Sequence, residues 1–430
     1  MFQTLKNAWR IADLRKKILY TLFIVFIFRL GSAIPAPFVD FKALEQVFNA
    51  TVAGGSMLSL INVFTGGSLS SATIFAMGIS PYINASIILQ LLCVAIPALE
   101  RIVKEGGEEG KKKINTWTRY LAVVLGLVQG TAYYMMISSW GILTETSWWA
   151  GVVIVLTFTA GTALIMWLGE RITENGIGNG ISIILFAGIV SRGPQLAMAL
   201  WNQLTSGGLG IVLGILMIVI GLAMVIMIVY MSNAERRIPI QYAKRVVGRK
   251  MYGGQSTHLP IKVNAVGVLP IIFASSILAL PATIGMFMDT PAEGSLGAIV
   301  LGLFQQTSPF YIVLYAILIF AFSYFYASIQ FNPIEISNNL KQNGGFIPGF
   351  RPGRTTAEFI TKALSKVLFI GAIFLCVVAL VPLIVGAFST SLKNVAIGGT
   401  SVVIVVGVAL ETVQQLEAQL MMRHHKGFLE

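Results

Sequence analysis

Residues that could carry out chemistry are scarce in this 430-residue chain and stand at the ends of its apolar segments. No acidic residue lies deep within an apolar stretch, since Glu170 and Glu411 fall at the ends of two of them, and the three histidines lie in polar segments. Ion-coupled transport needs ionisable groups within the membrane, and intramembrane hydrolysis needs a nucleophile with a base or a metal. We therefore expect no catalytic residue, no metal site and no cofactor.

The two cysteines and the glycines offer no further chemistry. Cys93 and Cys376 each sit inside an apolar stretch, with no partner at metal-ligand spacing, which is typical of packing residues. Nowhere does a glycine-rich loop end in Gly-Lys-Ser or Gly-Lys-Thr, so hydrolysis of a nucleotide by that route is excluded.

Apolar segments of membrane-spanning length dominate the chain. Hydrophobic residues make up 56% of the sequence and charged residues 11%, and the mean hydropathy is +0.80. Runs near 20 residues recur, whereas a soluble protein needs only shorter ones. The sequence therefore predicts an all-α, polytopic membrane protein with ten transmembrane helices, at about 18–33, 71–96, 118–138, 149–168, 181–200, 211–230, 263–282, 310–330, 367–388 and 395–410.

The distribution of Lys and Arg predicts the orientation, because basic flanks resist translocation. Of the 30 basic residues, Lys42, Arg192 and Lys393 fall on one side and Arg29 lies within the first span; the other 26 lie on the side of the N-terminus. With an even number of spans both termini share that side. We expect it to be the cytoplasmic side of a bacterial inner membrane.

Two places interrupt the apolar pattern. Arg192, followed by Gly193 and Pro194, breaks the fifth span, and irregular backbone at that depth is tolerated only against protein or a water-filled cavity. An aqueous funnel in the outer half is the expected reason. The short patch before the second span, 56–68, is either an amphipathic turn on the surface or a re-entrant segment, and the residues leave both open. Arg29 is expected to have a structural role, with its charge at a surface.

The second and seventh spans carry an internal repeat. Segment 78–89 (GISPYINASIIL) and segment 267–278 (GVLPIIFASSIL) share seven identities at a constant offset, and a weaker echo links the fifth and tenth spans. The seventh span comes five spans after the second, and because five is an odd number the second half crosses the membrane in the direction opposite to the first. This predicts an inverted repeat of two five-helix halves with a pathway between them.

Two long basic segments, 232–262 and 331–366, separate the sixth span from the seventh and the eighth from the ninth. Both contain turn-forming pairs such as Gly253-Gly254 and Pro352-Gly353. Projecting basic loops with fixed turns suit the docking of a cytosolic partner, although topogenic charge alone would also explain most of the lysines.

Six motifs are distributed along the chain: 78–92 (GISPYINASIILQLL), 176–182 (GIGNGIS), 255–264 (QSTHLPIKVN), 331–333 (FNP), 346–353 (FIPGFRPG) and 398–401 (GGTS). They are similar to those of the SecY family of protein-export channels, and the likeness extends over essentially the whole chain. The resemblance implies an N-terminal half, 1–200, and a C-terminal half, 211–430, hinged at 201–210 around a central hourglass pore.

The resemblance also implies the functional residues. A hydrophobic pore ring falls on Ile79, Ile83, Leu185, Ile189, Ile272 and Ile404, where Leu185 replaces an isoleucine common in the family. A plug of the outer funnel falls on about 57–70, with its core at Leu60, Ile61, Asn62, Val63 and Phe64. Docking of partners falls on Arg351 first, supported by Arg236, Arg237, Lys244, Arg245, Arg249 and Lys250.

The function that follows is a passive protein-conducting channel, driven by a partner and able to release transmembrane segments sideways into lipid. Its implied partners are small membrane subunits of the SecE and SecG type, the SecA ATPase, the ribosome, signal sequences and nascent polypeptides, and membrane lipid. A secondary transporter of small solutes is the alternative, because inverted repeats and broken helices fit that class too. The missing intramembrane carboxylates count against it.

Overall fold

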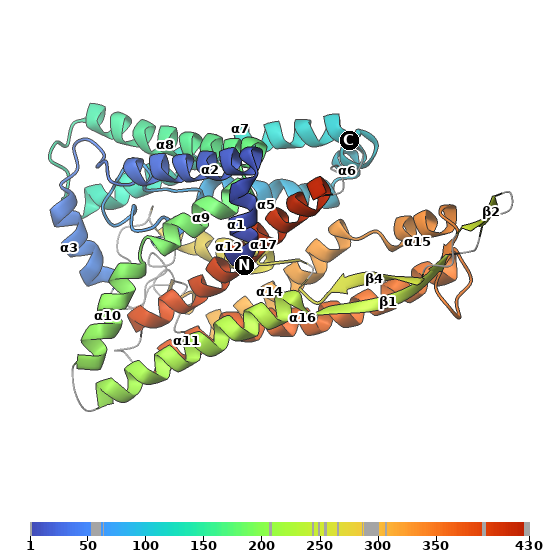
Figure 1. Ribbon diagram of the computed structural model, residues 1–430. Helices are drawn as coiled ribbons and strands as arrows, with labels where there is room; N and C mark the ends of the chain where they lie inside the picture. Colours follow the sequence, from blue (N-terminus) through green and yellow to red (C-terminus); the bar gives the residue numbers. More distant parts are fainter. Residues whose placement is uncertain are drawn as a thin grey trace.

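The structure is a computed structural model that describes residues 2–52, 62, 64–205, 209–242, 245–247, 250–252, 256–264, 266–285, 287, 301–305, 308–388 and 393–424. Long helices run across the body of the molecule, and a narrow ribbon of strands projects from one end (Figure 1). Helix α3, the end of α10 and the start of α11 lie at the opposite end (Figure 1).

The N-terminal half consists of helices and turns. Its helices are α1 (Phe2–Arg10), α2 (Ala12–Gly31), α3 (Phe41–Val52), α5 (Ser80–Ala95), α6 (Pro97–Glu105), α7 (Gly107–Ser139), α8 (Trp148–Asn175), α9 (Gly180–Val190) and α10 (Gly193–Thr205). The predicted interruption of the fifth span is confirmed, because α9 ends at Val190 and α10 begins at Gly193.

The C-terminal half adds strands to its helices. It comprises α11 (Leu209–Asn233), β1 (Glu235–Tyr242), β2 (Arg245–Val247), β3 (Lys250–Tyr252), β4 (Ser256–Lys262), α12 (Leu269–Gly285), α14 (Pro309–Gln330), α15 (Pro333–Gln342), β5 (Gly345–Phe346), α16 (Arg354–Phe388) and α17 (Lys393–His424). Because α10 continues to Thr205 and α11 begins at Leu209, most of the segment predicted as the hinge is helical.

Each of the ten predicted spans overlaps a helix, and the fifth is divided between α9 and α10. Seven helices of the described chain are long and apolar enough to cross a membrane, and α5 with α6 forms an eighth candidate that bends by 106°. The other two are α2, whose first half is basic, and α12, a shorter apolar helix of 17 residues. The chain is thus a multi-pass membrane protein.

The second predicted span was placed too early. Residues 65–79 form turns, and the helix begins only at Ser80. Gly66, Gly67, Ala72 and Gly78 all have positive φ angles, which a right-handed helix does not accommodate. The helix therefore cannot extend back to residue 71.

The segment 232–262, interpreted as a loop with fixed turns, is a β-ribbon instead. β1 pairs antiparallel with β4 and with β5, and β2 pairs with β3. Ile238 and Ile240 are buried while their neighbours are exposed, so the strand alternates with a period of two residues. The all-α prediction thus holds for the body of the protein but not for this projection.

The second basic segment, 331–366, is mostly ordered structure. It contains α15 and β5, and α16 begins at Arg354, ahead of the predicted membrane boundary at 367. Ile360, Ala363 and Leu364 are buried at helical spacing and belong to one hydrophobic cluster with Ile238 of β1 and with Ile347, which follows β5. The ribbon and the start of α16 therefore form one unit.

The two halves have the same order of neighbouring helices. In the first half α5 contacts α7, α7 contacts α8, and α8 contacts α9; in the second half α12 contacts α14, α14 contacts α16, and α16 contacts α17. The first helix of each half, α2 or α11, contacts the fourth and fifth helices of its own half. This correspondence supports the inverted repeat.

A close approach in the first half gives a test of the fold. A Cβ atom on Gly161 of α8 would lie 2.0 Å from the carbonyl oxygen of Ile74, which is backbone and cannot rotate away. We expect Gly161→Ala to lower the free energy of unfolding by about 1–3 kcal/mol, measured as a lower thermal midpoint of the purified protein. Gly221→Ala in α11, where a Cβ meets nothing within 4 Å, is the control and should be neutral or mildly stabilising.

Candidate functional site

Six aliphatic side chains from both halves are buried in one large hydrophobic cluster. The residues predicted as the pore ring are all buried, with relative exposures of 4% for Ile79, 7% for Ile83, 2% for Leu185, 5% for Ile189, 4% for Ile272 and 1% for Ile404. All six belong to a single hydrophobic cluster. None of the six side chains is exposed to lipid, and a ring around a pathway requires such burial.

The helices that supply these side chains form the boundary between the halves. Ile79 and Ile83 lie at the start of α5, Leu185 and Ile189 lie on α9, and Ile272 and Ile404 lie on α12 and α17. α5 contacts α12 across the boundary, and α9 contacts α17. Four of the six side chains therefore come from the N-terminal half and two from the C-terminal half.

The repeat reproduces the backbone that positions Ile83 and Ile272. Gly78 and Gly267, which precede α5 and α12, have φ angles of 55° and 68°. In the first half the amide of Ile83 donates to the carbonyl oxygen of Ile79 at 3.1 Å, and in the second the amide of Ile272 donates to that of Val268 at 3.2 Å. The same turn thus aims an isoleucine at the boundary from each side.

The segment predicted as the plug folds back on itself next to this cluster. The side-chain oxygen Oδ1 of Asn62 accepts from the amide of Ser70 at 3.0 Å, and its carbonyl oxygen accepts from the amide of Gly67 at 2.9 Å. Asn62 is 5% exposed and Phe64 packs against the aliphatic cluster. Leu60, Ile61 and Val63 lie outside the described residues.

The segment predicted as the plug is in contact with α9. A Cβ on Gly188 would lie 2.9 Å from the carbonyl oxygen of Phe64, and one on Gly66 would lie 2.8 Å from that of Gly188. The two backbones therefore touch where glycine permits it. On the other side, the hydroxyl of Tyr133, from α7, donates to the carbonyl oxygen of Leu69.

Tyr133 was missed by the sequence reasoning. It lies in the middle of the third apolar segment, and a buried tyrosine hydroxyl normally finds a hydrogen-bond partner. A tyrosine within a predicted span could therefore have indicated that its helix donates a hydrogen bond to a neighbouring segment without regular secondary structure.

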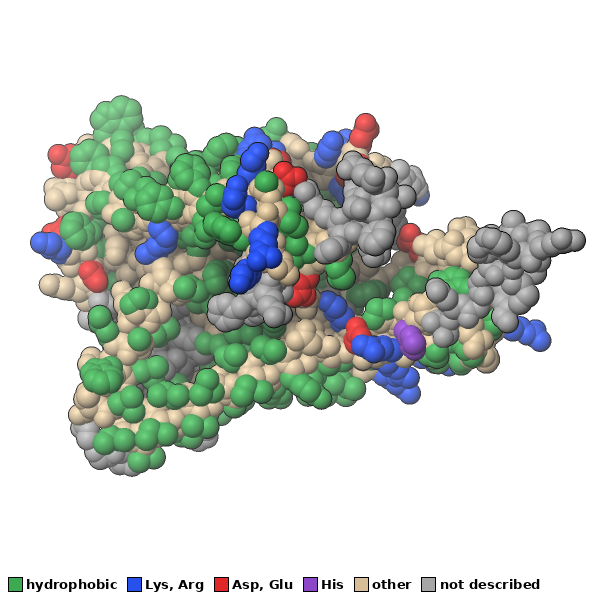
Figure 2. Space-filling view, in the orientation of Figure 1, with side chains coloured by type: hydrophobic (Ala, Val, Ile, Leu, Met, Phe, Trp, Pro, Cys, Tyr) green, Lys and Arg blue, Asp and Glu red, His purple; other side chains and the backbone are tan. Residues whose placement is uncertain are grey.

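Basic residues gather toward the end from which the ribbon projects. Figure 2 shows Lys and Arg side chains over that part of the surface and a hydrophobic band along α11. Arg236 and Arg237 of β1 are exposed, and the Nε atom of Arg237 pairs with Oε1 of Glu235 at 2.7 Å. Arg245 and Lys250 lie in β2 and β3, without described side chains, and Lys244 and Arg249 fall outside the described residues.

Arg351 stands in a turn whose backbone is held from several sides. Its carbonyl oxygen accepts from the hydroxyl of Thr356 at 2.8 Å, and the hydroxyl of Ser337 donates to the carbonyl oxygen of Gly353 at 2.7 Å. Gly349 and Gly353 have φ angles of 87° and 109°, so both need glycine. The guanidinium is exposed and has no ion pair within the described chain.

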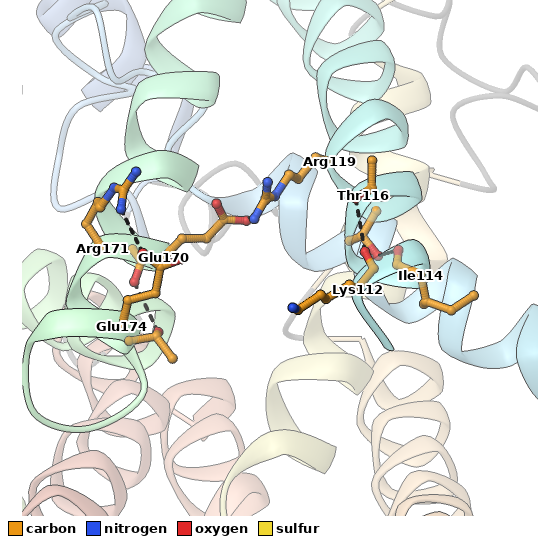
Figure 3. Close-up of polar contacts among 10 residues, drawn as sticks. Lys112, Ile114, Thr116, Arg119, Glu170, Arg171 and Glu174 are labelled. Atoms are coloured by element: carbon orange, nitrogen blue, oxygen red, sulfur yellow. Dashed lines mark hydrogen bonds and ion pairs between the residues drawn. The ribbon is translucent and has the colours of Figure 1, made fainter. Parts of the chain in front are cut away.

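Glu170, which lies at the end of an apolar segment, forms an ion pair between α8 and α7. Its Oε1 atom lies 2.7 Å from Nε of Arg119, which joins α8 to α7 (Figure 3). On the same helix Arg171 pairs with Glu174 at 2.8 Å (Figure 3). A carboxylate held in this way serves to connect helices, and we assign it no role in ion coupling.

No metal centre is found in the part of the chain that the structure describes, where no group of three or more His, Cys, Asp or Glu side chains comes together. The site is thus an aliphatic boundary, flanked by a hydrogen-bonded segment on one side and a basic projection on the other.

Comparisons with known proteins agree with this arrangement. The family model of SecY matches residues 73–413. The protein translocase subunit SecY of Streptomyces scabiei is 45% identical to the chain, and the alignment covers 100% of both. That of Thermotoga maritima is 44% identical and is covered to 98% of its length.

Solved structures share the fold at low sequence identity. One described as a protein conducting channel has a TM-score of 0.62 at 17% identity and covers 94% of this chain and 92% of its own. A structure concerning the plug domain of a SecY protein, described as stabilising the closed state, has a TM-score of 0.61 at 18% identity with the same coverage. Canine Sec61 in a ribosome-channel complex has a TM-score of 0.58 at 16% identity, again with the same coverage.

The bond between Asn62 and Ser70 gives a local test. Replacing Asn62 with Leu keeps the approximate volume but removes the acceptor, leaving the amide of Ser70 unpaired at a cost of about 1–3 kcal/mol. We expect hydrogen exchange in segment 64–70 to speed up by about tenfold or more. Thr131→Val is the control, because the Thr131 hydroxyl bonds only within its own helix. Unchanged exchange in the Asn62→Leu variant would show that the bond does not hold the segment.

Proposed function

Because the chain belongs to the SecY family, we propose that it is a protein-conducting channel for unfolded secretory polypeptides, which also releases transmembrane segments sideways into lipid. The observation that carries this function is the burial of six aliphatic side chains in a hydrophobic cluster that both halves share. Aliphatic groups do not coordinate ions, so a narrow collar of them excludes water and small solutes. A polypeptide can part such a collar because no specific bonds have to be broken.

We assign the pore ring to Ile79, Ile83, Leu185, Ile189, Ile272 and Ile404, and the plug to about 57–70. Contact of Phe64 with the aliphatic cluster and of the segment backbone with α9 supports the plug. The lateral gate lies between α5 and α7 on one side and α12 and α14 on the other. We also assign the hinge between the halves to 201–210, and the matching order of helix contacts in the two halves supports the division.

The basic projection is the docking surface in this proposal. Arg351, on its fixed turn, contacts the SecA motor or the ribosome, and the arginines and lysines of the ribbon support it. A planar guanidinium on a rigid turn suits bidentate contact with a carboxylate or phosphate. The low burial of α11 leaves an apolar face for small membrane subunits of the SecE and SecG type.

The channel is passive in this proposal, with its energy supplied by the partner and no catalytic step of its own. The basic side faces the cytoplasm of a bacterium, with both termini there, and the membrane is the inner one. A transporter of small solutes is not supported, since the curated relatives are named as translocase subunits. The direct experiment is reconstitution with the motor and a pre-protein, with protection of the substrate from protease as the readout.

The collar gives the first functional prediction. The double change Ile83→Asn and Ile272→Asn places amides at the same position of both repeats, which wets the boundary. We expect ion conductance of reconstituted vesicles to rise several-fold. The pair Ile83→Val and Ile272→Val keeps the aliphatic character and should remain tight, and equal conductance of the two variants would argue against the ring.

The turn that holds Arg351 gives the second functional prediction. Arg351→Glu reverses a charge on an exposed turn, so motor-driven export should fall by at least tenfold while membrane insertion of the channel stays normal. Arg354→Glu, three residues further on, is the matched control, because that side chain is 94% exposed and pairs with Glu358. Export that persists in the Arg351→Glu variant would remove this residue from the docking surface.

A further inference from the structure

A groove of about 460 Å³ opens between α14 and α16, away from the boundary between the halves. Three side chains of α14 and six of α16 line it, and all are apolar. Ile317, Ile373 and Ile384 at its rim are exposed, whereas Cys376 and Leu380 are half-buried. The groove is therefore open to the surroundings along both helices, with a hydrocarbon floor.

The groove extends over the depth of a single leaflet. Along α16 it runs from Ile373 to Ile384, which at 1.5 Å per residue is about 16 Å. The hydrocarbon core of a bilayer is about 30 Å thick. An occupant that fills the groove therefore needs to be apolar over about half of the membrane.

Cationic side chains stand beyond one end of the groove, on the same face of α16. Lys362 and Lys366 precede Ile373 at helical spacing, with Lys366 two turns away, about 10 Å. Both are exposed, and neither has an acidic partner among the described residues. Two positive charges are thus left at the level where the apolar part of the helix begins.

Aromatic rings lie at the end of the groove that is nearer the lysines, where Phe320 is part of the lining. Phe320 lies 5.8 Å from Tyr324 and 5.6 Å from Phe369, measured between ring centroids. The hydroxyl of Tyr324 donates to the carbonyl oxygen of Ser365 at 3.4 Å. A tyrosine such as Tyr324 is typical of the membrane interface, so the lysines lie at headgroup level and the groove at chain level.

We propose that this groove binds one acyl chain of an anionic glycerophospholipid of the same leaflet, whose phosphate pairs with Lys366 and Lys362. The occupant has to be negative at one end and apolar for the depth of one leaflet. A partner helix would need an apolar face across the full membrane, and helix pairs in lipid use small or polar residues, whereas branched aliphatic residues predominate here. A zwitterionic lipid fits the groove but brings its own ammonium group toward two lysines.

The test uses the full chain, purified with its accompanying subunits and placed in nanodiscs of phosphatidylglycerol and phosphatidylcholine. One of the two lipids carries a photoactivatable group near the middle of its acyl chain, and cross-linked peptides are identified by mass spectrometry. We expect labelling of 373–384 by phosphatidylglycerol to exceed that by phosphatidylcholine about fivefold for each lysine engaged. Equal labelling by the two lipids would overturn the proposal.

Two variants distinguish the contribution of the lysine charges from that of the space in the groove. Lys362→Gln with Lys366→Gln should reduce phosphatidylglycerol labelling to the phosphatidylcholine level, and Lys111→Gln with Lys112→Gln on α7 is the control of equal charge. Ala316→Leu, which fills the groove from α14, should lower labelling by both lipids. Preference that persists without the two lysines, or cross-links to a protein subunit in place of lipid, would refute the assignment. None of these readouts depends on transport, so the outcome is independent of the proposed function.

Discussion

Contact between the two halves depends on aliphatic side chains that make no directional bonds. Ile83 of one half and Ile272 of the other arise from the same turn, in which a glycine with positive φ precedes the helix. Hydrogen bonds or ion pairs at this boundary would hold the halves at one spacing and would cost several kcal/mol to break in a low-dielectric setting. Dispersion contacts are individually weak, so they seal the boundary when it is closed and exchange readily for contacts with a passing chain.

Directional interactions are found away from that boundary, where parts need a fixed position. Arg119 and Glu170 join α7 to α8 at one end of the membrane region. The ribbon and the start of α16 share a small core around Ile238 and Ile347. The ribbon and the start of α16 are held together by this core, whereas the two halves meet through aliphatic contacts that are individually weak. A protein that binds the ribbon could therefore move one half relative to the other without distorting the ribbon.

The apolar segments could be predicted because the bilayer imposes their length, and each of the ten overlaps a helix. The start of α5 could not, since the positive φ angles before it depend on the tertiary contacts of Gly66 and Gly78. The ribbon was missed because its strands are rich in polar and basic residues, although Ile238 and Ile240 alternate with exposed residues. The early start of α16 was legible in the spacing of Ala357, Ile360 and Leu364, but the charges among them favoured a loop.

The bond from Tyr133 to the carbonyl of Leu69 ties a spanning helix to the segment that rests on α9. The Tyr133 side chain is fully buried, so separating the two groups leaves a hydroxyl and a carbonyl unpaired, at about 1–3 kcal/mol for each. If α7 swings outward with the bond intact, it pulls the segment along with it. Movement of α7 and movement of the segment that rests on α9 are therefore linked through this one hydrogen bond.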